Sequence, residues 1–172
     1  GVQTCALPIF SVSNKKNLKP LLRILRKFKI EIVSSGGTYK KIKNLGFSCI
    51  EVSNFTEFPE ILEGRIKTLH PKIHAGILYK RKNKKHLKNI KENNLNTIDL
   101  VIVNFYPFEE VIQNTSNHEK IMENIDIGGP TMVRAAAKNY NDVAVITSID
   151  QYDELLNQLD RSEEHTSELQ SP

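Results

Sequence analysis

The sequence SSGGT, residues 34–38, has the composition of a turn that binds an anion. Glycines allow backbone N–H groups to approach an anion closely, hydroxyls donate further hydrogen bonds, and the start of a helix adds partial positive charge. Ser11, Ser13 and Lys15 follow an earlier apolar run and supply more donors. An ordinary strand-to-helix turn has a similar composition, so this motif by itself leaves both a phosphate site and a structural turn open.

A second stretch, GRIKTLHPKIH at residues 64–74, gathers cations, a hydroxyl and two histidines. An anion-binding loop and a solvated basic loop both fit this composition. His70 and His74 have the i, i+4 spacing that lets two side chains share a metal ion on one face of a helix. Pro71 lies between them and no acidic residue stands at metal-site spacing, so we expect no metal site here.

The sequence NFYPF, residues 104–108, follows an apolar run. The amide of Asn104 and the phenol of Tyr106 could hydrogen-bond a planar heterocycle or a developing oxyanion. The aromatic rings of this stretch could instead cap the core, and the motif alone does not choose between these roles.

The sequence IDIGGPTMVRAAAKN, residues 125–139, combines a carboxylate, two glycines and two basic residues. Arg134 and Lys138 are one helical turn apart and share a helix face. Asp126 and Lys138 are candidates for a proton-transfer pair, for which a structural salt bridge is the common alternative.

Short apolar runs rich in β-branched residues alternate with helical patterns along the chain, which is typical of a parallel α/β sheet. The polar motifs follow several of these runs, and ligands bind beyond the carboxyl ends of the strands in such sheets. We expect strands at 10–12, 31–33, 49–52, 100–103 and 143–146. We expect helices at 18–28, 38–45 and 84–91, one that begins at Pro130, and one with a capping box from Ser148 to Gln151.

The two ends of the chain can share one origin at the nucleotide level. Residues 1–9, GVQTCALPI, can be encoded by a string whose reverse complement, read in a shifted frame, encodes residues 161–169, RSEEHTSEL. That string matches a common sequencing-library adapter. We therefore expect residues 1–9 and 161–172 to be adapter-encoded, and residues 10–160 to be one domain from a truncated gene fragment.

The remaining residues, about 150 in number, are enough for one domain with a sizeable core. Their composition argues against several classes of function. Basic residues outnumber acidic ones by 24 to 20, or by 23 to 17 without residues 161–172. The densest basic stretch, residues 80–91, has no aromatic rings to stack on bases, so we expect a solvated helix face and no nucleic-acid partner.

Cys49 is the one cysteine outside the expected adapter, which suits a reducing cytoplasm. No apolar run is long enough to span a bilayer, so we expect no membrane partner.

Five segments resemble the IMP cyclohydrolase family in order and spacing: SVSNK, SSGGT, FPEILEGRIKTLHPKIHAGIL, NFYPFEE and IDIGGPTMVRAAAKN. The resemblance covers nearly all of residues 10–160. It implies a methylglyoxal-synthase-like fold, which is a three-layer α/β/α unit with a mostly parallel sheet. It also implies that the full-length enzyme has a larger transformylase domain, missing here, and that it forms a homodimer.

By the same resemblance, the substrate is a small-molecule nucleotide, 5-formamidoimidazole-4-carboxamide ribonucleotide, which closes to inosine monophosphate with loss of water. No metal or organic cofactor is implied. The family's catalytic positions fall on Lys67, Tyr106, Asp126 and Lys138. Its substrate-binding positions fall on Ser11, Ser13, Lys15, Ser35, Gly36, Gly37, Thr38, Arg65, Thr68, Asn104, Ile127 and Gly128. Asn14 stands where the family has an aspartate, which changes a position beside the site.

The chemistry that the resemblance implies explains why these residue types are needed. A poorly nucleophilic carboxamide nitrogen must attack the formyl carbon, negative charge grows on the formyl oxygen, and water must leave. Our hypothesis is that Lys67 and Tyr106 stabilise the oxygen, while Asp126 and Lys138 move the carboxamide and leaving-water protons.

Two other functional classes share this fold. A nucleotide-sensing regulatory domain, like that of carbamoyl-phosphate synthetase, would bind a ligand without turnover and would leave the motif at 125–139 unexplained. Methylglyoxal synthase, which eliminates phosphate, shares the phosphate turn but not RIKTLHP followed by NFYPF.

Pro8 falls within or beside the first expected strand, which lies inside the sheet in this fold. A missing N–H is poorly tolerated there. We predict that restoring the natural residues before Ser11 raises the melting temperature in thermal denaturation. An unchanged melting temperature would mean that Pro8 lies outside the strand.

Overall fold

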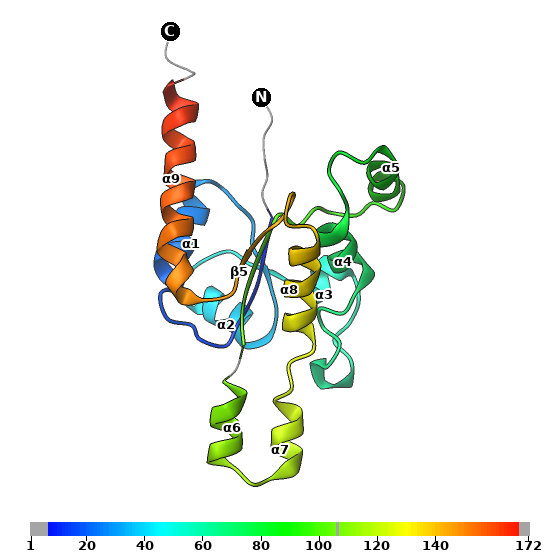
Figure 1. The fold of residues 1–172 in the computed structure, drawn as a ribbon, viewed down its shortest axis with the longest axis vertical. Helices are drawn as coiled ribbons and strands as arrows, with labels where there is room; N and C mark the ends of the chain where they lie inside the picture. Colours follow the sequence, from blue (N-terminus) through cyan, green and yellow to red (C-terminus); the bar gives the residue numbers. More distant parts are fainter. Residues whose placement is uncertain (1–6, 106, 169–172) are drawn as a thin grey trace.

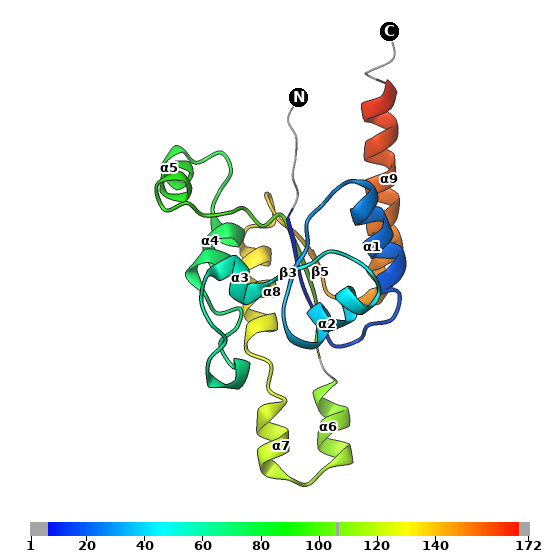
Figure 2. The same cartoon turned by 180° about the vertical axis from the view of Figure 1, so that it is seen from behind.

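The computed structural model describes residues 7–105 and 107–168, in which five parallel strands form one sheet. The strands are β1 (Pro8–Val12), β2 (Val33–Ser34), β3 (Ile50–Glu51), β4 (Leu100–Asn104) and β5 (Ala144–Ile146). Their order is β3-β2-β1-β4-β5, which places β1 in the centre of the sheet. Figures 1 and 2 show the sheet between helices from opposite sides.

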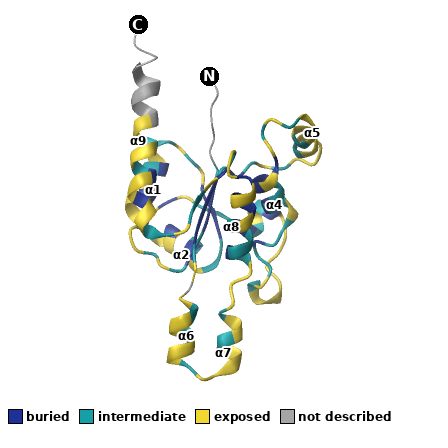
Figure 3. Cartoon of the chain, viewed as in Figure 1, coloured by how far each residue is buried: buried dark blue, intermediate teal, exposed yellow. Residues whose placement is uncertain are grey.

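Helices cover both faces of this sheet. One face carries α1 (Leu18–Lys27), α2 (Gly36–Asn44) and α9 (Tyr152–Glu168), and the other carries α3 (Val52–Thr56), α4 (Pro71–Leu78) and α8 (Gly128–Lys138). Successive side chains of β1 serve both layers, because Phe10 packs with α1 and α9 while Ile9 packs with α4 and α8. Figure 3 shows the buried strands between helices whose outer faces are exposed. The predicted three-layer α/β/α fold is confirmed, and its sheet is parallel throughout the described residues.

Most expected elements are present, with shifts at their ends. The helices at 18–28 and 84–91 are confirmed as α1 and α5 (Lys84–Glu92), and α2 begins at Gly36, two residues before its expected start. The strand expected at 31–33 is β2, and the strand expected at 49–52 is shortened to β3 because Val52 begins α3. Pro130 is the third residue of α8 rather than the first, which costs little because the first four helical N–H groups have no partner within the helix. Ser148 forms the expected capping box with Gln151 ahead of α9, in the 3₁₀ turn η2 (Ile149–Gln151).

The helix α4 was not predicted, because Pro71 was taken as an obstacle to it. Pro71 is instead its first residue, where the fixed φ and the missing N–H are suited to a helix start. His70 caps the helix, since its Nδ1 accepts the Lys72 N–H at 3.1 Å. The two histidines therefore do not both lie on a helix, as a shared metal site would need, and His70 has a structural role at the helix start.

Three further elements were not predicted: the 3₁₀ turn η1 (Leu62–Gly64) and the helices α6 (Phe108–Asn114) and α7 (His118–Glu123). The helices α6 and α7 form a hairpin that projects from one end of the sheet in Figure 1. Residues 124–127 lead from this hairpin back to the start of α8. Of the described helices, none is long and apolar enough to cross a membrane.

Parts of both segments that we expected to be adapter-encoded, residues 1–9 and 161–172, lie within regular elements of the structure. Pro8 is the first residue of β1, where it pairs with Leu100 of β4, while pairing with β2 begins one residue later at Ile9. The expectation that Pro8 falls in the first strand is confirmed, although its missing N–H lies at the strand start, where proline is best tolerated. The helix α9 continues through Arg161 into residues that we expected to be adapter-encoded.

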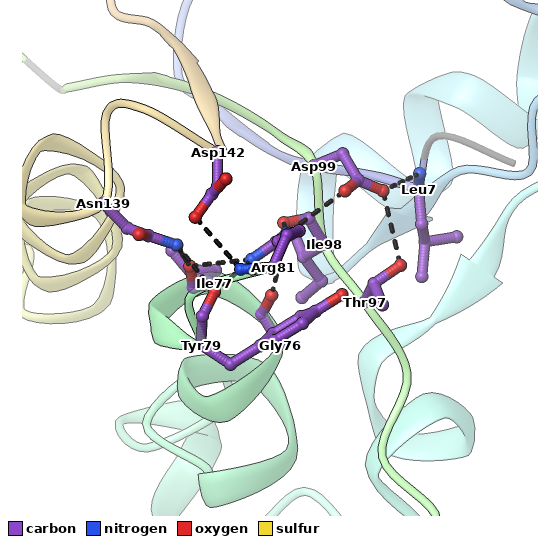
Figure 4. Close-up of polar contacts among 10 residues, drawn as sticks. All are labelled: Leu7, Gly76, Ile77, Tyr79, Arg81, Thr97, Ile98, Asp99, Asn139 and Asp142. Atoms are coloured by element: carbon purple, nitrogen blue, oxygen red, sulfur yellow. Dashed lines mark hydrogen bonds and ion pairs between the residues drawn. The ribbon is translucent and has the colours of Figure 1, made fainter. Parts of the chain in front are cut away.

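Arg81 joins three segments near the amino end of β4 (Figure 4). Its guanidinium donates to the carbonyls of Tyr79 and Ile98 at 2.7 Å each and forms an ion pair with Asp99 at 3.1 Å. The same group lies over the Tyr79 ring, 4.0 Å from its centre. The Arg81 N–H donates to Asp142 at 3.1 Å, which adds the segment before β5. The Arg81 side chain thus ties the end of α4 to the segment before β4, and its main-chain N–H adds the segment before β5.

We predict that Arg81→Ala lowers the free energy of unfolding by about 3 kcal/mol, because it leaves Asp99 and two carbonyls without their charged donor. Urea denaturation followed by circular dichroism measures this loss. Arg81→Lys keeps the charge but not the planar guanidinium group, so it should also lower the free energy of unfolding by more than about 1 kcal/mol. Arg23→Ala, on the exposed face of α1, is the control. Its free energy of unfolding should differ from that of the unmodified chain by less than about 0.5 kcal/mol. A loss for Arg81→Ala no larger than that of the control would contradict the assignment.

Candidate functional site

The carboxyl ends of β1 and β2 open onto a cleft of about 560 Å³. Its walls come from Ser11 of β1, Ser35 after β2, the segment after η1, and the segment that joins α7 to α8. The lining residues are Ser11, Ser35, Glu63, Gly64, Arg65, Lys67, Thr68, Met122, Glu123, Asn124, Ile125, Asp126, Ile127, Gly128 and Gly129. The predicted convergence of strand-end loops on one crevice is therefore confirmed.

The SSGGT motif forms the start of α2 beside this cleft. Ser35 is extended and precedes the helix, and Gly36 begins it with a φ of +54°, which a residue with a side chain rarely adopts. Two ammonium groups lie close to this turn. A Cβ atom on Gly36 would lie 3.3 Å from Lys67 Nζ, and one on Gly37 would lie 3.8 Å from Lys15 Nζ. A helix N-terminus flanked by two lysines is an arrangement that attracts an anion.

Thr38 does not offer its side chain to the cleft. Its hydroxyl accepts the Val12 N–H at 3.1 Å and donates to the Val12 carbonyl at 3.0 Å, and the residue is buried. The single hydroxyl proton is used inside the protein, so it is not available to an anionic ligand. The Thr38 side chain therefore joins α2 to β1, and its assignment as a substrate-binding position stays a prediction.

Ser13 and Asn104 are likewise engaged with the backbone around the strand ends. The Ser13 hydroxyl lies 2.6 Å from the Phe105 carbonyl and 3.0 Å from Asn104 Oδ1. The Asn104 side chain accepts the Asn14 N–H at 2.8 Å and donates to the Asn14 carbonyl at 3.2 Å. Asn104 thus fixes the loop after β1 against β4, and neither Ser13 nor Asn104 lines the cleft. Tyr106 lies outside the described residues.

The two cations of the cleft are both paired with carboxylates. Lys67 Nζ lies 3.0 Å from Glu60 Oε1, and Arg65 pairs with Glu123 at the end of α7. The hydrogen bond to Glu123 raises the pKa of the Arg65 guanidinium above its usual range. Sequence reasoning missed both carboxylates, because they belong to a loop and a hairpin whose paths no sequence pattern fixes. These carboxylates hold the two cations at the walls of the cleft.

The segments that carry Thr68 and Asp126 approach each other closely across the cleft. Asp126 Oδ1 accepts the Gly129 N–H at 2.9 Å, which anchors the carboxylate at the start of α8. A Cβ atom on Gly128 would lie only 2.2 Å from Thr68 Oγ1, and one on Gly129 would lie 2.4 Å from Asp126 Oδ2. Gly128 is needed because a side chain there would push the Thr68 wall away, and Gly129 is needed because a side chain there would displace the Asp126 carboxylate that its own N–H binds.

Lys138 lies at the opposite end of α8 from Asp126. It is the last residue of α8, whose first residue is Gly128, and it is exposed. A rise of 1.5 Å per residue separates the two ends of this helix by about 15 Å, and Figure 1 shows α8 running away from the α7 end of the molecule. The predicted proton-transfer pair of Asp126 and Lys138 is therefore wrong within a single chain, because a helix keeps its two ends apart.

His74 supports the loop at Thr68 from below. The ring is half-buried, and this burial lowers the pKa of its imidazole, while a hydrogen bond with the Thr68 backbone acts in the opposite direction. Among the described residues, no group of three or more histidine, cysteine, aspartate or glutamate side chains is arranged to hold a metal ion.

Comparison with known proteins places this geometry in a family. The family model described as an MGS-like domain matches residues 17–131. The bifunctional purine biosynthesis protein PurH of Clostridium acetobutylicum is 49% identical over 156 residues, which cover 91% of this chain and 31% of that protein. The PurH protein of Acetivibrio thermocellus is 50% identical over 153 residues, which cover 88% of this chain and 30% of that protein. The crystal structure of ForH superposes with a TM-score of 0.80 at 30% identity, covering 91% of this chain and 80% of that one.

This chain spans about 30% of the length of the curated PurH relatives that it matches. The family model, by contrast, extends over most of the chain, and the parallel sheet with its strand-end cleft agrees with the solved structure. The chain belongs to the MGS-like domain family.

Proposed function

We propose that this chain carries the IMP cyclohydrolase activity of a bifunctional purine biosynthesis enzyme. The reaction would close 5-formamidoimidazole-4-carboxamide ribonucleotide to inosine monophosphate with loss of water. The observation that carries the proposal is the convergence of Lys67, Thr68 and Asp126 in one cleft, with the SSGGT turn at its wall. The similarity to PurH proteins supports the same reaction class.

In this proposal the phosphate of the nucleotide binds at the start of α2. The backbone N–H groups of Gly36 and Gly37 are among the first in the helix, and such groups have no partner within the helix. Lys15 Nζ, which also donates to the Ser13 carbonyl at 3.2 Å, lies beside Gly37 and adds a positive charge. Ser11 and Ser35 supply hydroxyls from the cleft wall. Gly36, Gly37 and Thr38 contribute through their backbone and their position in this turn.

The heterocycle would then lie between the Lys67 and Asp126 sides of the cleft. Lys67 stabilises the negative charge that grows on the formyl oxygen, as a fixed cation does for a developing oxyanion. Asp126 accepts the carboxamide proton as the nitrogen attacks the formyl carbon. Arg65, Thr68, Ile127 and Gly128 complete the wall around the substrate. The hydrogen bond from Gly129 fixes the Asp126 carboxylate, so that it needs little reorganisation during the reaction.

Two elements of the family assignment stay predictions. Tyr106 is expected to assist Lys67 at the formyl oxygen. Lys138 lies at the far end of α8 from Asp126, and its assignment as a catalytic residue rests on the family resemblance alone. The full-length enzyme, with its transformylase domain, is expected to be a homodimer that acts on small-molecule nucleotides without a cofactor.

We predict that Asp126→Asn lowers kcat at least 100-fold, because the general base is lost, while KM changes less than about threefold. Asparagine keeps an oxygen that can accept the Gly129 N–H, so the start of α8 is preserved. The measurement is the appearance of inosine monophosphate absorbance when the chain is incubated with the formylated ribonucleotide.

Asp142→Asn is the matched control for this substitution, since Asp142 accepts the Arg81 N–H away from the cleft. Its kcat should equal that of the unmodified chain. Nucleotide binding without any turnover by the unmodified, folded chain would instead favour the nucleotide-sensing class of domain and would sink the enzyme assignment.

A further inference from the structure

Lys67 lies between two hollows of the protein. Besides the cleft, the described residues form a smaller hollow of about 100 Å³ whose lining includes Phe58, Ile61 and Ile66. Ser35 and Lys67 line both hollows, whereas Glu60 lines only the smaller one. Glu60 therefore approaches the Lys67 ammonium from the smaller hollow and not from the cleft, where the substrate would bind.

The ion pair between Glu60 and Lys67 occupies a space that the backbone leaves free for it. A Cβ atom on Gly64 would lie 2.6 Å from Lys67 Nζ and 2.8 Å from Glu60 Oε1, so a side chain at this position would displace the pair. Gly64 has a φ of +86°, a conformation that also favours glycine. The same ammonium lies beside Gly36 at the start of α2. Its position thus depends on two glycines and one carboxylate.

A carboxylate at this distance competes with an incoming anion. Its negative charge neutralises the ammonium that would attract a phosphate-bearing ligand, and it repels the ligand itself. The side chains of Lys67 and Glu60 are 26% and 43% exposed, so the pair is partly withdrawn from solvent and screened less than a fully exposed one. The ion pair between Glu60 and Lys67 therefore has to separate, at least in part, before Lys67 can bind an anion in the cleft.

We propose that Glu60 is an affinity-determining residue of the cleft: it holds Lys67 in the unliganded protein and lowers the affinity for a phosphate-bearing ligand, which must draw Lys67 away from it. This inference rests on the proposed function in one respect, because it takes the cleft to bind a nucleotide phosphate. If Glu60 only positioned Lys67 for the ligand, loss of the carboxylate would weaken ligand binding instead of strengthening it.

The test measures the binding of inosine monophosphate and of inorganic phosphate to the full chain by isothermal titration calorimetry. Glu60→Gln should bind both probes about fivefold more tightly than the unmodified chain, as expected for the loss of one partly buried ion pair. The gain should shrink as sodium chloride is raised, because salt screens the charge that was removed. Glu60→Ala removes the same charge and serves as a second variant if the amide disturbs the loop.

Glu57→Gln is the matched control. Glu57 lies three residues earlier in the same segment and pairs with Lys72, which does not line either hollow. Its substitution changes the net charge by the same amount, so an equal gain in affinity would reduce the effect to overall charge and overturn the proposal. Unchanged or weaker binding by the Glu60 variants would overturn it as well.

The two probes separate this inference from the proposed function. Binding of phosphate without binding of inosine monophosphate would reject the nucleotide substrate, while the comparison of variants with phosphate would still decide the role of Glu60. Binding of neither probe to the unmodified chain would reject both ideas.

Discussion

The backbone at the carboxyl end of β1 and in the loop after it extends beyond the pairing with β2 and must find other hydrogen-bond partners, and the geometry of the cleft depends on how it does so. On one side, the Thr38 hydroxyl takes both the N–H and the carbonyl of Val12. On the other side, the Asn104 amide does the same for Asn14. The loop after β1 is therefore held between α2 and β4. Neither Thr38 nor Asn104 lines the cleft, yet together they bring Ser11, Lys15 and the start of α2 to one place.

Charge around the cleft is balanced locally rather than over the whole chain. Lys15, Arg65 and Lys67 gather near a helix N-terminus that itself carries partial positive charge, and such a concentration is unfavourable without compensation. Glu60 and Glu123 supply that compensation, Glu60 from the segment just before η1 and Glu123 from the end of α7, which lies outside the five motifs. The unliganded site therefore keeps its cations close to the ligand position while it avoids their mutual repulsion.

The sequence could predict the layers and the edge of the sheet at which the site lies, because both follow from short-range patterns. β-branched runs located the five strands, and the rule that strand-end loops converge placed Ser11 and Ser35 at one crevice. Lys67 and Asp126 follow no strand, and only the family resemblance assigned them to the same site. The two-residue strands β2 and β3 were misplaced by one or two residues, since tertiary pairing sets their limits. Pro71 was misjudged because its effect depends on whether a helix passes through it or begins at it. The pairing of Lys67 with Glu60, and the distance from Asp126 to Lys138, depend on the path of the folded chain.

The central place of β1 also shapes the order in which the protein can fold. Its main partner, β4, comes 92 residues later in the chain, as the pairing of Pro8 with Leu100 shows. A ribosome that adds roughly 5 to 20 residues per second needs about 5 to 20 seconds to deliver that partner. Over this interval one edge of the apolar strand β1 has no native ladder to join, and open strand edges are where misfolding and aggregation begin. The strand on which the cleft is built is thus synthesised well before the partner strand that covers its second edge.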